Sequence, residues 1–126
     1  MRGMIAGSGH GPAIGDGRIP EACVNWRVAV NHETDSMRHE RDMVRAIVVG
    51  SRYRPGVTLS SAELGAIEQP TLMIYGEADP TGSRAVWERV MDTLARGELA
   101  VLEGAGHMVW LDDAPGVARR TEAFLS

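Results

Sequence analysis

The stretch that decides the fold is Pro70-Thr71-Leu72-Met73-Ile74-Tyr75-Gly76-Glu77-Ala78-Asp79-Pro80. Its apolar part, residues 71–75, is a continuous run of strand length bounded by proline and glycine. Such runs are typical of a strand buried on both faces in a parallel sheet. A carboxylate, Asp79, follows shortly after the predicted strand ends.

Helix and strand alternate after this stretch. Residues 83–95 have helical periodicity, 99–102 are a second apolar run, and the last helix is predicted over 114–125. Asp113 would cap that helix and Pro115 would lie in its first turn. Because strand and helix alternate at the spacing of a parallel sheet, the predicted fold class is α/β.

The N-terminal half is less regular. Met4-Ile5-Ala6 predicts a short third parallel strand that runs into a glycine-rich loop. Helices are predicted over 21–30, over 37–49 and, from the capping-box pattern Ser60-Ser61-Ala62-Glu63, over 60–67. We therefore divide the chain into a strand and pocket loop (1–18), a helical cap segment (19–67) and a C-terminal α/β portion (68–126).

A histidine follows the second predicted strand, in the loop Gly104-Ala105-Gly106-His107. Neighbouring parallel strands lie about 5 Å apart and end at the same edge of the sheet, so we expect Asp79 and His107 to lie side by side. A carboxylate can fix the tautomer of an imidazole, which then takes a proton from a hydroxyl or thiol. The pair is predicted to be an acid–base couple, although an Asp-Pro turn also occurs for structural reasons alone.

The two loop motifs and the last helix together resemble part of a known protein family. The stretch Gln69–Pro80, then Glu103-Gly104-Ala105-Gly106-His107-Met108 and a helix ending Ala123-Phe124-Leu125, resembles the C-terminal part of the α/β-hydrolases. The resemblance implies that Asp79 and His107 are the catalytic acid and histidine that follow the seventh and eighth strands. Ile5–Gly11 resembles the end of the sixth strand, and Ile19–Ile67 is similar to the helical cap of the branch that includes carbon–carbon bond hydrolases of aromatic-ring degradation.

The chain departs from that family at the nucleophile. The Gly-x-Ser-x-Gly elbow of the family does not occur in the sequence. Ser8 comes nearest, but Ala6 and His10 stand where the elbow has glycines. We expect Ser8 and His10 to line the substrate pocket, and Ser8 stays open as a nucleophile. The resemblance thus implies a truncated hydrolase acting on an ester, an amide or a carbon–carbon bond next to a carbonyl; the alternative is a catalytically inactive fragment or binding module of the same fold.

Other side chains are assigned by pattern. Trp110 would either line the pocket or pack against the last helix. Asp112 and Asp113 are expected to cap that helix rather than bind a metal, because no ligand stands at metal-site spacing, and no cofactor is expected. On the cap helices, Trp26, Met37 and Met43 could face substrate, but an amphipathic stripe is more often core and we expect them to be buried. The single cysteine, Cys23, is expected to be an inert buried thiol.

Composition limits the partners. A net charge of −4 and a pI of about 5.5 predict no binding to nucleic acid or to an anionic membrane. The resemblance to the hydrolases implies a small-molecule substrate. No apolar stretch approaches the roughly 20 residues of a membrane span, and one cysteine excludes an internal disulfide, as expected in the cytoplasm. About three strands leave a bare sheet edge, so we expect self-association or a partner chain at that edge.

Overall fold

The computed structural model describes residues 5–126. Its C-terminal part is built on two parallel strands, β3 (Thr71–Gly76) and β4 (Gly97–Leu102). The strands pair along their whole length, from Thr71 opposite Gly97 to Gly76 opposite Leu102. The predicted strands are therefore present, and their carboxyl ends meet at one edge of the sheet.

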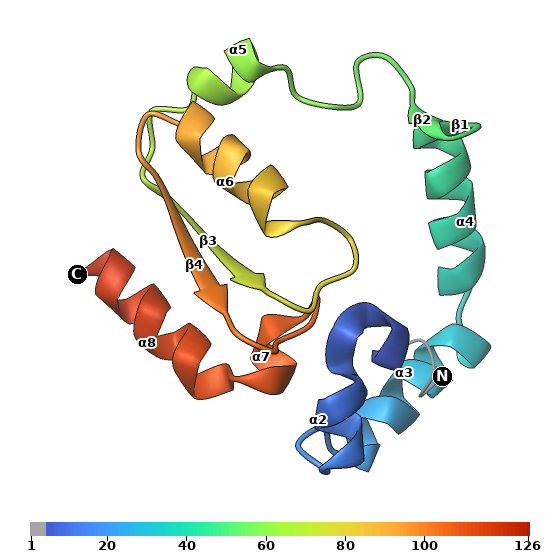
Figure 1. Cartoon of the computed structure of the whole chain (residues 1–126). Coiled ribbons are helices and arrows are strands. Elements are labelled where there is room, and N and C mark those ends of the chain that lie inside the picture. Colours follow the sequence, from blue (N-terminus) through green and yellow to red (C-terminus); the bar gives the residue numbers. More distant parts are fainter. Residues whose placement is uncertain (1–4) are drawn as a thin grey trace.

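Helices flank this small sheet on both sides (Figure 1). α6 (Arg84–Thr93) connects the two strands and contacts β4, whereas α8 (Ala114–Leu125) contacts β3 from the other side. A short helix, α7 (Val109–Asp112), joins β4 to α8. The fold is a partial α/β fold, as the sequence predicts, with a core of Leu102, Ala105 and Val109 between β4, the loop after it and α7.

Local signals in the sequence place the helix starts correctly. The Asp113 side chain accepts a hydrogen bond from the N–H of Gly116 at 2.9 Å and so caps α8. Ser60 and Glu63 form the predicted capping box at the start of α5 (Ser61–Gly65), which precedes β3. In both cases the cap uses side chains within three residues of the helix start, so no tertiary contact is needed to form it.

The predicted strand at residues 4–6 is wrong over its described part. Ile5 is helical, and a π-helical segment, η1 (Ala6–His10), follows it and leads into α2 (Gly11–Gly15). Met4 lies outside the described residues. A strand this short satisfies its backbone only by pairing with a neighbour, whereas a helical turn satisfies it locally. The described parallel sheet thus has two strands rather than three.

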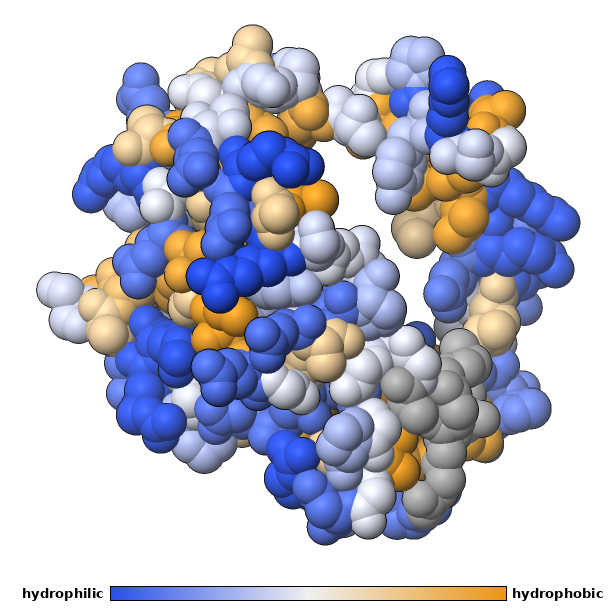
Figure 2. All heavy atoms as spheres, in the orientation of Figure 1, coloured by the Kyte–Doolittle hydropathy of each residue, from blue (hydrophilic) through white to orange (hydrophobic). Residues whose placement is uncertain are grey.

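The middle of the chain forms an arm that extends from the rest of the molecule (Figure 1). At its base α3 (Glu21–Glu33) lies beside α2, with Val24 buried in one cluster with Ile5, Ala13 and Ile19. Beyond it extend α4 (Ser36–Ile47) and an antiparallel hairpin of β1 (Val48–Val49) and β2 (Arg52–Tyr53). In the space-filling view an opening separates α4 and the hairpin from the α/β part (Figure 2). No residue of α4 is buried.

The expected burial of Cys23, Trp26, Met37 and Met43 is wrong. Trp26 is 65 % exposed and Met43 58 %, and Met37 and Cys23 are exposed as well. Periodicity correctly predicts helices with an apolar stripe, but burial needs a second layer to cover that stripe. Helix α4 packs mainly on α3 and β1, and none of its residues is buried, so its stripe stays in contact with water.

Across the described residues, none of the helices combines the length and apolar character needed to cross a membrane.

Candidate active site

The carboxylate and imidazole at the carboxyl edge of the sheet are in contact. His107 Nδ1 lies 2.9 Å from Asp79 Oδ2. The Asp79 side chain is only 7 % exposed, whereas that of His107 is 52 % exposed. The buried carboxylate is thus anchored, and the imidazole faces outward. The spatial relation expected from the sequence is present.

Backbone hydrogen bonds join the two loops that carry this pair. The N–H of Ala78 donates to the carbonyl of Ala105 at 2.9 Å, which continues the ladder beyond the last paired residues of β3 and β4. The N–H of Asp79 turns back to the carbonyl of Gly76 at 3.0 Å. Gly76 is required here, because a Cβ at this position would lie 2.2 Å from the carbonyl oxygen of Gly106.

Thr81 completes the surroundings of the carboxylate. Its N–H and hydroxyl donate to Asp79 Oδ1 at 2.8 Å and 2.7 Å, so Oδ2 is left to the imidazole. Burial alone would raise the pKa of Asp79, but the hydrogen bonds from His107 and Thr81 together outweigh it and hold the pKa below its ordinary value. Asp79 is therefore ionised at neutral pH.

An ionised partner at Nδ1 selects the tautomer of the histidine. The carboxylate only accepts, so the His107 ring carries its proton on Nδ1, an assignment made from the hydrogen-bond partners. Nε2 then carries the lone pair and is the nitrogen that can exchange a proton with a reacting group. This is the arrangement needed in a general base.

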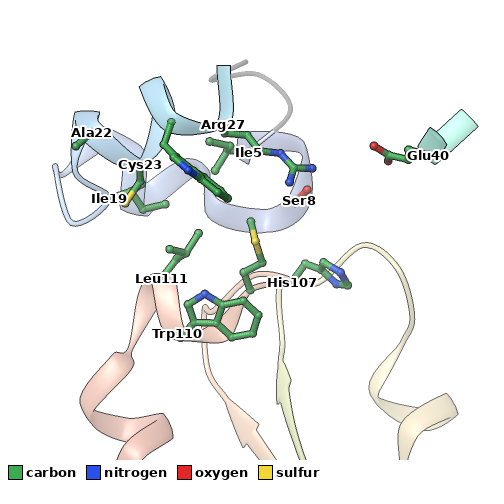
Figure 3. Close-up of a pocket in the computed structure, with 12 residues that line it drawn as sticks. Ile5, Ser8, Ile19, Ala22, Cys23, Arg27, Glu40, His107, Trp110 and Leu111 are labelled. Atoms are coloured by element: carbon green, nitrogen blue, oxygen red, sulfur yellow. The ribbon is translucent and has the colours of Figure 1, made fainter. Parts of the chain in front are cut away.

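A cavity of about 860 Å³ lies beside His107 (Figure 3). Ile19, Ala22 and Cys23 line one wall, and Trp110 and Leu111 line the opposite wall. Arg27 and Glu40 add charges of opposite sign. The cavity is mainly apolar, and its size is that of sites that bind small organic molecules.

Of the three residues expected to line the pocket, Ser8, His10 and Trp110, the structure places two at the cavity. Ser8 and Trp110 line the cavity with His107. Trp110 is 57 % exposed, so it does not pack as a core residue against the last helix. His10 is a correction: its side chain is completely buried and lies outside the cavity lining. The reason is a buried partner, Asp112, whose Oδ2 lies 2.6 Å from His10 Nδ1.

Asp112 is also a correction, because it does not cap α8. Its Oδ2 accepts hydrogen bonds from the His10 ring and from the N–H of Gly106, at 2.6 Å and 2.8 Å. Local sequence gives Asp112 and Asp113 the same capping chemistry, so only the tertiary contact tells them apart. Sequence reasoning missed this pair. The available signal was the histidine inside the glycine run at residues 7–11, where small residues allow close backbone packing.

Gly9 shows why the run is glycine-rich. It has a φ of 88°, and a Cβ there would lie 2.3 Å from the carbonyl oxygen of Ala78 and 2.9 Å from the Cα of Gly106. The turn of η1 thus packs backbone to backbone on both loops of the candidate site. Any larger residue at this position would push η1 away from the site.

The described residues contain no cluster of three or more side chains suited to hold a metal ion. The chemistry that the site offers is that of an acid–histidine couple beside an apolar cavity.

Comparison with known proteins relates part of the chain to a hydrolase. The chain is 35 % identical over 54 residues to ABHD14B of Rattus norvegicus, described as a candidate protein-lysine deacylase. The match spans 43 % of this chain and 25 % of the rat protein. It supports an α/β-hydrolase-like relationship.

A second match is to a polyketide synthase, ThaQ, of Burkholderia thailandensis. The chain is 33 % identical to it over 66 residues, which are 52 % of this chain and 3 % of that protein. The aligned segment is thus a small part of either relative. No family model and no solved structure matches the chain.

Proposed function

We propose that this chain carries the acid–base half of a hydrolase active site, with His107 and Asp79 as its catalytic residues. The substrate would be an ester, an amide or a carbon–carbon bond next to a carbonyl. The observation that carries the proposal is the 2.9 Å contact between His107 Nδ1 and Asp79 Oδ2 at the carboxyl edge of two parallel strands. Functional groups gather at this edge in open parallel sheets.

In this proposal His107 acts twice. Its Nε2 first takes the proton of the attacking hydroxyl and donates it to the leaving group of the substrate, which leaves the acyl group on the hydroxyl oxygen. It then takes a proton from a water molecule, whose attack releases the acyl group as the acid, and returns that proton to the hydroxyl. Asp79 remains ionised, holds the ring in the Nδ1–H tautomer and stabilises the imidazolium that forms between the two steps. The lowered pKa of Asp79 suits this role, because a protonated carboxyl would lose its charge stabilisation of the ring.

The cavity suggests the acyl part of the substrate. Its walls are apolar, with Trp110 and Leu111 close to the His107 loop, so a bulky apolar or aromatic acyl group would be buried there. A carbonyl at the His107 end of such a group would come within reach of the base. The amide option agrees in kind with the deacylase description of the rat relative.

The attacking group has two candidate sources. Ser8 lines the same cavity as His107, and its carbonyl accepts the N–H of His107 at 2.9 Å. The other source is a partner chain of different sequence that pairs with an edge of the two-stranded sheet and supplies a serine from its own strand end, because no serine directly follows β3 or β4 of this chain. Self-association at that edge would appear in size-exclusion chromatography as a species larger than 13.6 kDa.

Hydrolysis of a p-nitrophenyl ester with an aromatic acyl group tests the proposal. We expect turnover that falls about 10²–10⁴-fold in His107→Ala, the range typical of losing a positioned acid–base group. His39→Ala, at an exposed position of α4, is the matched control and should keep full activity. Loss in Ser8→Ala would identify Ser8 as the nucleophile, and retention would exclude it.

The second candidate function is a catalytically inactive binding module, which the volume and apolar lining of the cavity favour. The same experiment separates the two. Absence of turnover in the wild-type chain, together with quenching of tryptophan fluorescence by the intact ester, would support the binding module. Trp26 and Trp110 line the cavity and would report the bound ring.

A further inference from the structure

His10 and Asp112 form a buried pair that the proposed chemistry does not use. The His10 side chain has no exposed surface, and that of Asp112 is 5 % exposed. The two residues are 102 positions apart in the sequence, and the 2.6 Å contact between Nδ1 and Oδ2 ties η1 to α7. Buried ionisable pairs are weak contributors to net stability, so their presence calls for another explanation.

The remaining hydrogen-bonding capacity of this pair is directed at one loop. Asp112 Oδ2 also accepts the N–H of Gly106 at 2.8 Å. His10 Nε2 accepts the N–H of Met108 at 3.0 Å, so the proton of this ring lies on Nδ1. Both partners therefore bind the backbone of the residues that directly flank His107.

The amide of His107 itself is held by the same segment. Its N–H donates to the carbonyl of Ser8 at 2.9 Å, two residues before His10. Three successive amides, 106 to 108, thus donate to η1 or to α7 rather than to water. Fixing the backbone at both neighbours leaves the His107 ring only its own side-chain torsions.

From these contacts we propose that His10 and Asp112 are positioning residues, which hold the loop of His107 so that its imidazole stays on Asp79. This inference rests on the proposed role of His107 as the base. A small displacement of a catalytic group costs rate steeply, about 100-fold for 1 Å in unfavourable cases. The buried pair would act on catalysis through geometry, without touching the substrate.

Two substitutions of His10 each keep one of its two contacts and remove the other. His10→Gln can present an acceptor toward Met108 N–H but loses the contact with Asp112. His10→Asn can keep a donor toward Asp112 but does not reach Met108. His10→Ala removes both. His39→Gln makes the same change as His10→Gln at an exposed histidine and serves as the matched control.

The main readout is ¹⁵N NMR of histidine-labelled full chain, which reports the tautomer of the His107 ring without any need for turnover. In the wild type and in His39→Gln we expect the His107 ring to be a single Nδ1–H tautomer. In His10→Ala the His107 ring should become a mixture of tautomers, and His10→Gln should recover part of the Nδ1–H form. If His10→Ala does not fold, as judged by circular dichroism, Asp112→Asn replaces it, with the same expected mixture.

Ester turnover is the second readout. We expect kcat to fall about 100-fold in His10→Ala with KM nearly unchanged, and the fall to be smaller in His10→Gln. A folded His10→Ala chain that keeps a pure Nδ1–H tautomer at His107 would overturn the inference. If the wild-type chain has no turnover, the proposed function fails, and the NMR result alone decides whether the pair positions His107.

Discussion

The His107–Asp79 and His10–Asp112 pairs contact the same loop, yet only the first faces solvent. Both join an Nδ1 to a carboxylate Oδ2, at 2.9 Å and 2.6 Å. In the first pair the imidazole is 52 % exposed and borders the cavity, so its Nε2 can meet a substrate. In the second the imidazole has no exposed surface and its Nε2 already accepts a backbone N–H.

The difference teaches that the chemistry of a histidine–aspartate pair depends on what the second ring nitrogen faces. An Nε2 that faces a cavity and can be reached by a substrate is suited to proton transfer. An Nε2 occupied by a backbone amide suits the fixing of a loop. The same residue types, on the two sides of one loop, are thus suited to two different tasks.

Replacement of the two aspartates should produce the largest contrast. In Asp79→Asn we expect turnover to fall about 10²–10⁴-fold, because the amide no longer enforces the productive tautomer. In Asp112→Asn we expect a smaller loss of turnover and a larger loss of unfolding free energy, because the buried pair is broken. Ester kinetics and urea denaturation measure the two effects. Equal effects of the two substitutions on both measurements would break the comparison.

A smaller effect is expected from Gly106→Ala. The new Cβ would lie 2.6 Å from the carbonyl oxygen of Ser8 and 2.8 Å from Cε1 of His10, so the loop must move away from the buried pair. We expect the free energy of unfolding to fall by about 2–3 kcal/mol, as for overpacking of a filled site. Urea denaturation checks this value.

Gly7→Ala is the matched control for that substitution. A Cβ at Gly7 would meet nothing within 4 Å, so the change in unfolding free energy should stay below about 0.5 kcal/mol. A Gly106→Ala chain as stable as Gly7→Ala would mean that η1 does not pack on the loop.

The smallest effect concerns acid stability. The pKa of Asp79 is lower in the folded chain than the ordinary 3.8, so the unfolded state binds more protons between the two values. The contribution of Asp79 to stability is therefore fully present above its ordinary pKa and is lost as pH falls through the folded pKa. It should be small, because His107 is half exposed and solvent screens the pair.

Urea denaturation as a function of pH measures this contribution. Asp79→Asn should flatten the loss of stability below about pH 4 relative to the wild type. Asp92→Asn makes the same substitution at an exposed carboxylate on α6, away from the pair, and serves as the matched control. The same acid slope in Asp79→Asn and in the wild type would contradict the lowered pKa.

Much of the α/β part could be predicted from the sequence. The apolar runs of β3 and β4, the stripe of α6 and the cap Asp113 are local signals, and each forms the element expected of it. The contact of Asp79 with His107 also follows, because both residues come after neighbouring parallel strands and parallel strands end together.

The rest depended on contacts that no local pattern contains. The apolar pattern at residues 5 and 6 predicts a strand, but both residues are helical, because no described strand pairs with them. The apolar stripe of α4 predicts buried side chains, but the stripe is exposed, because no described layer covers it.

The sequence by itself determined the strands and helices of the α/β part and the meeting of Asp79 with His107, because apolar periodicity and caps are local and paired parallel strands end at one edge of the sheet. Only the tertiary structure decided that Asp113 caps α8 while Asp112 binds His10. The physical reason is burial. A carboxylate and an imidazole removed from water must satisfy each other, and which groups lose water together is a property of the packed chain.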